Sequence, residues 1–219
     1  MLTDKLDYKK VYKNLYLPKC EPNLIDVPSM NFIMVEGKGN PNAEGGEYQL
    51  AVELLYGLSY TIKMSKMGKF IPTGYFEYVV PPLEGLWWMS DNTMDFSVKD
   101  KYCWISMIRQ PEFVTDEVFQ WACCEVIKKK PLLDVSKAKL ETFREGLCVQ
   151  MMHIGPYSDE PKTITMIESY IQSNNLKEGS SSVLANGTIN HHHEIYLSDP
   201  RKTDPIKMKT VLRHPVEYK

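Results

Sequence analysis

A glutamate directly follows three histidines near the C-terminal end of the chain, in the stretch His191-His192-His193-Glu194. A run of isoleucine, tyrosine and leucine follows and ends shortly before an Asp-Pro pair, which is typical of a strand. Glutamate is a poor strand residue unless its side chain faces water. Glu194 is therefore a solvated surface charge, a metal ligand beside the histidines, or a carboxylate directed at a ligand.

The two faces of this predicted strand decide between those roles. Glu194, Tyr196 and Ser198 share one face, because side chains alternate along a strand. If the opposite face, with Ile195 and Leu197, packs under helices, Glu194 is solvated. If the Tyr196 face lines a binding site, Glu194 is a partly buried carboxylate. Such a group attracts cations and can act as an acid or base beside another protonatable group.

The histidines invite a comparison with zinc sites. Consecutive histidines on a strand point to alternate faces, so only His191 and His193 could bind one metal ion together. The sequence has no cysteine or second histidine cluster near this run, and no Walker loop or GxGxxG motif. We therefore predict no metal ion and no cofactor, and we interpret the three histidines as incidental.

Aromatic residues form the second group that could do chemistry. Tyr56 and Tyr60 are four apart on a predicted helix and share a face. Aromatic rings stack on planar ligands and hold cations, each contact contributing about 0.5–2 kcal/mol. The same spacing is also typical of a hydrophobic core. The predicted ligand-binding residues are Tyr56, Tyr60, Tyr75, Glu77, Trp87, Trp88 and Tyr196, and the predicted catalytic residues are Glu194 and Tyr157.

A second carboxylate could share the site with Glu194. Glu77 matches Glu194 when the two halves of the chain are compared, and Glu84 follows a double proline. Two carboxylates in one site push one pKa up, which is a route to an acid or base at neutral pH. The spacing does not decide whether either residue meets Glu194.

The composition is that of an ordinary globular protein. The chain has 219 residues, is 43% hydrophobic, and carries a formal net charge of -2. A protein built to bind nucleic acid needs a basic face, so we predict no direct nucleic-acid binding. Five cysteines without a CxxC pair are typical of reduced thiols. The charged N-terminus and the lack of a run of about 20 apolar residues predict a cytoplasmic protein without a membrane segment.

Periodicity and turn residues predict the elements that must position these side chains. A long helix covers 47–64, and a second covers 115–130, with Thr115 as its N-cap. The remaining predicted helices cover 7–17 and 158–174, and the predicted strands cover 30–35, 74–80, 102–109, 139–154 as a strand or strand pair, 191–200 and 209–213.

The order strand, helix, strand, strand occurs twice along the chain. This repeat predicts an α+β fold of two modules with pseudo-two-fold symmetry, an antiparallel sheet with the helices on one face, and a groove between those helices. We expect one domain over 1–219, with module one at about 30–111, a connecting helix at about 115–130, and module two at about 139–216.

Four separated stretches resemble the stand-alone GyrI-like small-molecule-binding family. They are HEIYLSDPRKTDPIKMKTVLRHPV, YVVPPLEGLWW, MIRQPEFVT and MHIGPYSDEP, and the resemblance runs from about residue 7 to 217. It implies a central groove for bulky, often cationic or aromatic compounds. In related activator domains a glutamate of the C-terminal strand lies at the floor of that groove, and Glu194 occupies the matching place. The segment 178–190 departs from the family by being longer than a short glycine turn.

The resemblance implies a small-molecule ligand. Some stand-alone members resemble hydrolases that open the cyclopropane of DNA-alkylating antibiotics with an aromatic cage, whereas others protect DNA gyrase or only bind ligands. We therefore expect xenobiotic binding and leave hydrolysis open. The alternative is a protein–protein modulator of the gyrase-protecting type without catalysis. The first 29 residues are too short for a helix-turn-helix domain, so a transcription-factor role is not expected.

Overall fold

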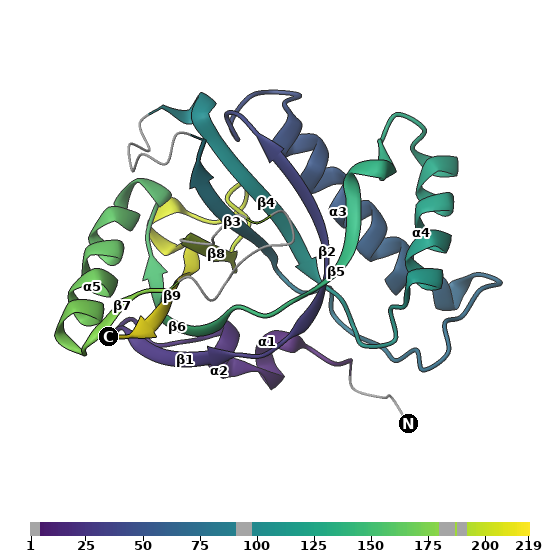
Figure 1. The fold of residues 1–219 in the computed structure, drawn as a ribbon. Coiled ribbons are helices and arrows are strands. Elements are labelled where there is room, and N and C mark those ends of the chain that lie inside the picture. Colours follow the sequence, from purple (N-terminus) through teal and green to yellow (C-terminus); the bar gives the residue numbers. More distant parts are fainter. Residues whose placement is uncertain (1–4, 91–97, 180–186, 188–191) are drawn as a thin grey trace. The chain divides into compact units, whose positions relative to one another are not determined.

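The computed structural model describes residues 5–90, 98–179, 187 and 192–219, and its helices and antiparallel strands form an α+β fold (Figure 1). The chain forms two compact units. Unit 1 contains Met1–Val11, Met30–Pro81 and Met89–Thr142, and unit 2 contains Tyr12–Ser29, Pro82–Trp88 and Phe143–Lys219. None of the helices in the described ranges has the length and apolar character that a membrane span needs.

Unit 1 contains three paired strands, with one long helix packed on them and a second helix packed on the first. Its elements are α1 (Tyr8–Val11), β2 (Met30–Lys38), α3 (Glu47–Lys63), β4 (Tyr102–Arg109), α4 (Asp116–Lys129) and β5 (Ala138–Phe143), with short 3-10 turns at Ser65–Met67, Lys99–Lys101 and Val135–Lys137. Strand β2 lies between β4 and β5. The buried side chains of Leu54, Leu58 and Ile62 lie on one face of α3, which packs on β2 and β4. The hydroxyl of Thr115 accepts a hydrogen bond from the Val118 amide, so the predicted N-cap of α4 is confirmed.

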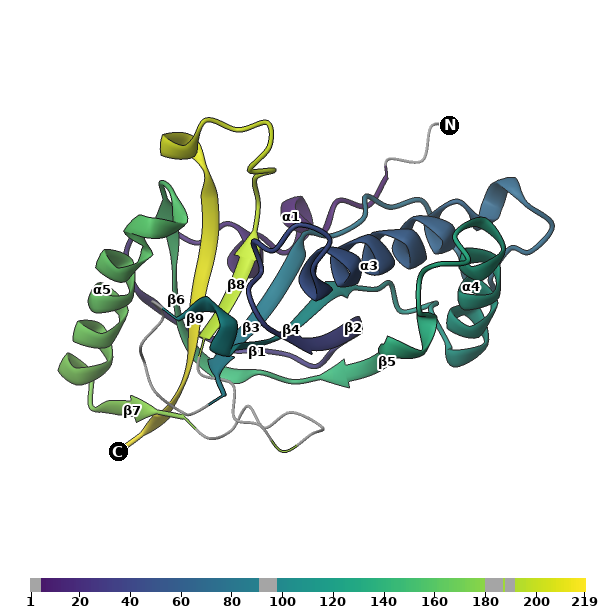
Figure 2. The ribbon, with the colours of Figure 1, turned by 90° about the horizontal axis from the view of Figure 1, so that it is seen from above.

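Unit 2 holds the larger sheet, with α5 along one face (Figure 2). Its elements are α2 (Lys13–Tyr16), β1 (Asn23–Val27), β3 (Leu83–Met89), β6 (Gly146–Ile154), α5 (Glu160–Ser173), β7 (Leu176–Glu178), β8 (His192–Tyr196) and β9 (Lys209–Tyr218), with 3-10 turns at Tyr157–Asp159 and Pro205–Lys207. The strand order is β1-β6-β9-β8-β3, and β7 pairs with the far end of β9. This order places β8 between β3 and β9, so the strand that carries Glu194 has a neighbour on each side.

The face of this sheet under α5 is mainly apolar. Ile167 and Ile171 of α5 pack on Val149 and Met151 of β6 and on Leu212 of β9, and all five side chains are buried. In β8 the same face carries Glu194, because Glu194 pairs with Leu212 in register. The glutamate of β8 therefore lies on the side of the sheet that the helix covers.

The opposite face of the sheet contains a buried chain of charged groups. Arg213 donates from Nη1 to the Glu145 carboxylate at 3.0 Å, and His193 Nδ1 lies 2.9 Å from the same carboxylate. On its other side, His193 Nε2 lies 3.1 Å from Glu84, which also accepts a hydrogen bond from the Tyr16 hydroxyl at 3.3 Å. The two glutamates, His193 and Arg213 are each 1% exposed, so the pairs are shielded from water.

This buried charge network fixes the register of the strand that carries Glu194. The charges on Glu145 and His193 stabilise each other despite the cost of burial, which lowers the pKa of Glu145 and raises that of His193. Arg213 also donates to the Leu15 carbonyl at 2.9 Å, which ties helix α2 to β9. A shift of β8 by one residue would turn His193 to the apolar face and leave these charges without partners.

The predicted repeat is confirmed in the order of the elements. The series β2–α3–β3–β4 is followed, after α4 and β5, by β6–α5–β7–β8–β9, which has the same order apart from the short additional strand β7. The predicted strand at 74–80 is wrong, because only Tyr78 forms an isolated bridge there, to Leu6. The strand follows the double proline instead, as β3, and it belongs to unit 2 up to Trp88.

Other predicted boundaries also differ from the structure. The predicted helix at 7–17 is two short helices, α1 and α2. The last strand continues through Pro215 to Tyr218, although a proline was expected to end it. Strands β1 and β7 were not predicted, because each is short and has no clear alternation of polar and apolar residues.

Candidate functional site

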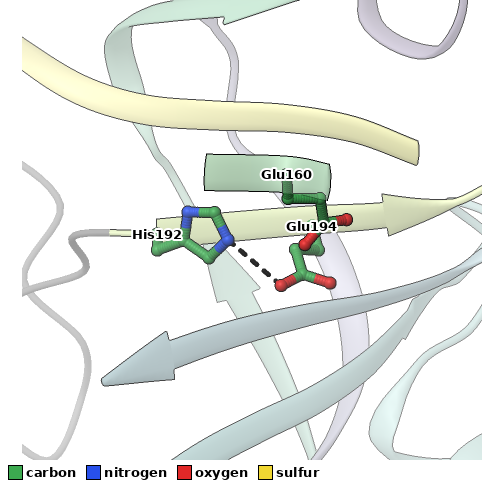
Figure 3. A group of neighbouring side chains, drawn as sticks. All are labelled: Glu160, His192 and Glu194. Atoms are coloured by element: carbon green, nitrogen blue, oxygen red, sulfur yellow. Dashed lines mark hydrogen bonds and ion pairs between the residues drawn. The ribbon is translucent and has the colours of Figure 1, made fainter. Parts of the chain in front are cut away.

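Three titratable side chains meet between β8 and the first turn of α5. His192 and Glu194 project from the same face of β8, and Glu160 approaches Glu194 from α5 (Figure 3). One nitrogen or oxygen atom from each lies within 4.8 Å of the others. Glu160 and His192 are buried, whereas Glu194 keeps 14% of its side chain exposed. A reactant could therefore reach the cluster most directly at Glu194.

The imidazole of His192 connects Glu194 to the interior. Its Nε2 lies 3.1 Å from Glu194 Oε1, and its Nδ1 lies 2.9 Å from Nε2 of His214 on β9. A hydrogen bond on each ring nitrogen fixes the orientation of the ring. The pair of Glu194 and His192 is thus a carboxylate with a fixed hydrogen-bond donor beside it.

Glu160 is the unusual member of the cluster. Its Oε1 is buried and has no hydrogen-bond partner. If Glu160 and Glu194 were both ionised no more than 4.8 Å apart, they would repel by roughly 3.5 kcal/mol or more at an effective dielectric constant of about 20. The N-terminus of α5 offers at most about 2 kcal/mol to a carboxylate. Burial and the charge of Glu194 therefore raise the pKa of Glu160 well above its ordinary value.

A histidine on β6 holds the first turn of α5 in place. His153 Nδ1 lies 2.8 Å from the hydroxyl of Thr163 on α5, and its Nε2 lies 3.1 Å from the carbonyl of Pro156. Because a carbonyl only accepts, Nε2 donates to Pro156, and Nδ1 accepts from Thr163 in the neutral ring. These two bonds fix the segment from Pro156 to Thr163, which carries both Tyr157 and Glu160.

Three aromatic residues stand on the same side of the sheet as Glu194. Trp87 of β3 donates from its indole nitrogen to the Tyr196 hydroxyl at 2.9 Å. The Tyr196 ring meets the Tyr157 ring edge to face, with centroids 6.0 Å apart. We call Trp87, Tyr157 and Tyr196 the aromatic cluster. It joins β3, β8 and the turn before α5, and it brings together three residues that the sequence analysis proposed separately.

A glycine makes this arrangement possible. Gly85 of β3 lies opposite Glu194 in register. A Cβ atom at Gly85 would stand 2.7 Å from the Trp87 indole nitrogen and 3.1 Å from the Tyr196 hydroxyl. The absence of a side chain therefore lets Trp87 lean across β3 and reach Tyr196.

The remaining predicted ligand-binding residues are not members of the aromatic cluster. Trp88 is half-buried. Because it is adjacent to Trp87 on β3, its side chain points to the opposite face of the strand. Tyr56, Tyr60, Tyr75 and Glu77 belong to unit 1. There the rings of Tyr56 and Tyr60 stack along α3 at 6.2 Å, as their spacing predicted.

Tyr75 and Glu77 have partners within unit 1. The Tyr75 hydroxyl donates to the Lys63 carbonyl at 2.7 Å, and its ring packs on Phe113. Glu77 forms an ion pair with Lys66, which lowers the pKa of Glu77. Because Glu77 lies outside any strand, its match to Glu194 in the repeat is wrong.

The histidine run is not incidental, which corrects the sequence interpretation. His192 belongs to the candidate site, where it contacts Glu194. His193 bridges the two buried glutamates on the other face of the sheet. Glu84 is one of these two, so it faces away from Glu194 and does not form the second carboxylate of the site. His191 and most of the long segment 178–190 lie outside the described residues.

The cluster could hold a small cation as well as a proton. Two carboxylates and an imidazole are ligands that divalent metal ions accept. A separate open hollow of about 410 Å³ lies between Pro22 and the outer side of α5, lined also by Thr165, Met166 and Tyr170. None of the titratable residues of the candidate site lines that hollow.

Comparison with known proteins identifies the family. The model of the GyrI-like small molecule binding domain matches residues 21–217. The chain belongs to this family. A conserved, uncharacterized Listeria innocua protein is 51% identical, with a TM-score of 0.89, and the match covers 97% of this chain and 100% of that chain. No match was found among curated proteins.

Two further solved structures of this GyrI-like family are described as a hydrolase from Listeria innocua. They are 49% and 50% identical to this chain, with TM-scores of 0.85 and 0.87. The matches cover 97% and 98% of this chain and 100% of each relative. The C-terminal domain of EcmrR, at 11% identity and a TM-score of 0.55 over 91% of this chain and 98% of its own, shares the fold alone.

Sequence reasoning missed two members of the candidate site, His192 and Glu160. The alternation along β8 contained enough information for His192, which is two residues before Glu194 and must share its face. No comparable pattern identified Glu160. A glutamate in the first turn of a helix is usually a solvated charge that favours the helix N-terminus.

Proposed function

We propose that this GyrI-like domain binds bulky, planar, hydrophobic or cationic xenobiotics against the aromatic cluster and hydrolyses strained cyclopropanoid compounds there. The observation that carries the proposal is the meeting, on one sheet face, of the aromatic cluster with a carboxylate and its histidine partner. Membership of a small-molecule-binding family supports the binding step. The relatives that are described as hydrolases, at about half identity over their full length, support the catalytic step.

The proposed chemistry needs little machinery, because a cyclopropanoid substrate stores ring strain. The rings of the cluster stack on the planar ligand, and Glu194 attracts a positive charge or removes a proton from water. His192 holds that carboxylate in one orientation. A hydroxyl of Tyr157 or Tyr196 donates a hydrogen bond to the phenolate oxygen that develops as the ring opens. Orientation of the water and one base then account for most of the acceleration.

Incubation with a cyclopropanoid antibiotic, followed by mass spectrometry, tests the catalytic step. The wild-type protein should produce the adduct with one added water molecule. Glu194→Gln should lower the rate by about 10²–10⁴-fold, which is the usual contribution of a general base. Glu178→Gln, an exposed glutamate on β7, is the matched control and should keep the wild-type rate. Equal rates in Glu194→Gln and the wild type would show that the carboxylate is not the base.

A thermal-shift series with planar cationic dyes tests binding without catalysis. A ligand that binds only the folded state raises the melting temperature, because it stabilises that state. The gain is about 2.7 kcal/mol when the ligand concentration is 100 times the dissociation constant. Glu194→Gln should reduce the shift for cationic dyes more than for neutral dyes of the same shape. If no dye or cyclopropanoid stabilises the protein, the small-molecule proposal fails, and the protein–protein modulator becomes the alternative to examine.

A further inference from the structure

The unpartnered oxygen of Glu160 points to a second function in the candidate site. Glu160 is 7% exposed, and its Oε1 makes no hydrogen bond. The carboxylate of Glu194 is the charged group that faces it, within the same 4.8 Å cluster. An ionised carboxylate in this position would be buried, unsolvated and beside a like charge, so it requires either a bound proton or a bound cation.

The hydrogen bonds around the cluster assign the proton to Glu160. Glu194 is the more exposed carboxylate, and it has His192 as a hydrogen-bond partner at 3.1 Å. The Oε1 atom of Glu160 is buried without a hydrogen-bond donor, which favours the neutral form of the carboxyl group. Several titratable groups of the described residues surround the cluster, and they are His192, Glu194 and Tyr196 of β8, His214 of β9, His153 of β6, and Tyr157, Asp159 and Lys162 around the start of α5.

Within the described part of the chain, no basic side chain in these surroundings replaces the proton. The ammonium group of Lys162 lies 3.4 Å from Asp159, and its side chain is 80% exposed. Arg213 is on the other face of the sheet, where it binds Glu145. Among the described residues, the imidazole of His192 is therefore the one group beside the two carboxylates that can carry a positive charge.

We propose that Glu160 is the proton donor of the site and Glu194 the proton acceptor, so that the two form an acid–base pair. This inference rests on the proposed hydrolysis. The oxygen of water forms a bond to a cyclopropane carbon as the C–C bond breaks, and the electron pair of that bond moves through the conjugated ring to the phenolate oxygen. Glu160 gives its proton to this oxygen, and Glu194 takes the proton of the water. Transfer of that proton from Glu194 to Glu160 restores the pair, and the sum is the addition of one water molecule.

NMR of protein labelled with ¹³C at the glutamate side-chain carboxyl tests the protonation directly. At neutral pH the wild type should show one glutamate with the chemical shift of a carboxylic acid, and this resonance should be absent from Glu160→Gln. Glu168→Gln, an exposed position on the same helix, is the matched control and should retain it. The proposal is overturned if the wild type has no such resonance. It is also overturned if the purified protein contains one metal ion per chain that Glu160→Gln loses.

Single-turnover hydrolysis of a cyclopropanoid tests the catalytic role. In the wild type the rate should fall at alkaline pH as Glu160 loses its proton. Glu160→Gln should be slower by about 10²-fold or more and should lack this alkaline decline, because glutamine does not titrate. Its binding of planar dyes should be unchanged. An equal rate and pH profile in the two proteins would remove Glu160 from the mechanism. If the wild type itself hydrolyses nothing, the proposed function fails, whereas the NMR result still decides whether Glu160 holds a proton.

Discussion

Replacement of Arg213 by methionine should strongly destabilise the protein, because it breaks the buried charge network behind β8. The guanidinium donates to Glu145 at 3.0 Å, to Gln150 at 3.0 and 3.1 Å, and to the Leu15 carbonyl at 2.9 Å. Loss of one partner of a buried ion pair costs about 3–5 kcal/mol, since the other charge stays buried. His193 remains beside Glu145 and reduces this cost. The carbonyl and the glutamine oxygen that lose their donor add about 1 kcal/mol or more each. We therefore expect a total near 4 kcal/mol.

Urea denaturation, followed by circular dichroism, measures this change. For an m-value of about 3 kcal/mol per M, a loss of about 4 kcal/mol moves the midpoint by about 1.3 M. Arg201→Met is the matched control, because Arg201 pairs with Asp199 at an 84% exposed position. Exposed ion pairs contribute about 0–1 kcal/mol, so the midpoint should move little.

A double-mutant cycle with Glu145→Gln separates the ion pair from the other lost bonds. The double variant should be more stable than the sum of the two single changes predicts, by about 1–3 kcal/mol, because no unpaired arginine or glutamate charge remains. If Arg213→Met moves the midpoint no more than Arg201→Met does, the network does not hold β8 in register, and the argument is refuted.

Two further predictions concern the aromatic cluster and pH. Gly85→Ala places a methyl group against Trp87 and Tyr196, so it should cost about 1–3 kcal/mol in thermal unfolding and weaken planar-dye binding; an unchanged dye affinity would contradict the role of the cluster. The lowered pKa of Glu145 gives stability that is complete above its unfolded value of 4.5 and is lost as the pH falls through the folded value. The raised pKa of His193 gives stability that is complete below 6.5 and is lost as the pH rises through its folded value. Urea denaturation across the pH range should therefore show a maximum between these limits, which a flat profile would contradict.

Local sequence patterns were sufficient for the elements whose own residues determine them. Helix α3 follows from the apolar ridge at Leu54, Leu58 and Ile62, and α4 from its threonine cap. The strand at 74–80 failed because alternation is a local property, whereas a strand also needs a partner. Phe76 and Tyr78 pack on the ring of Phe113 instead. Within unit 2 the partner of β3 is β8, more than 100 residues away, and no local pattern contains that information.

The sequence predicts those residues of the candidate site whose importance can be read from their own type and position in one element. Trp87, Tyr157, Tyr196 and Glu194 were selected from residue type, position and the family resemblance, and the structure brings the three aromatic residues into one cluster on the face of Glu194. Their roles stay predictions. Glu160 could not be found in this way, because its importance comes from burial opposite another carboxylate. That property depends on how α5 packs on β8 rather than on the sequence around Glu160.

Neither unit is a continuous piece of chain, since each is assembled from three segments. During synthesis, Glu84 is made 109 residues before its partner His193. At about 5–20 residues per second, roughly 5–20 s pass before β8 can join β3. Throughout this interval the tryptophans of β3 and its unpaired backbone groups lack the strand that will bury them. The nascent chain therefore needs its last third to complete the strands of unit 2. If synthesis stalls before residue 192, the edge of β3 that pairs with β8 stays open to other chains.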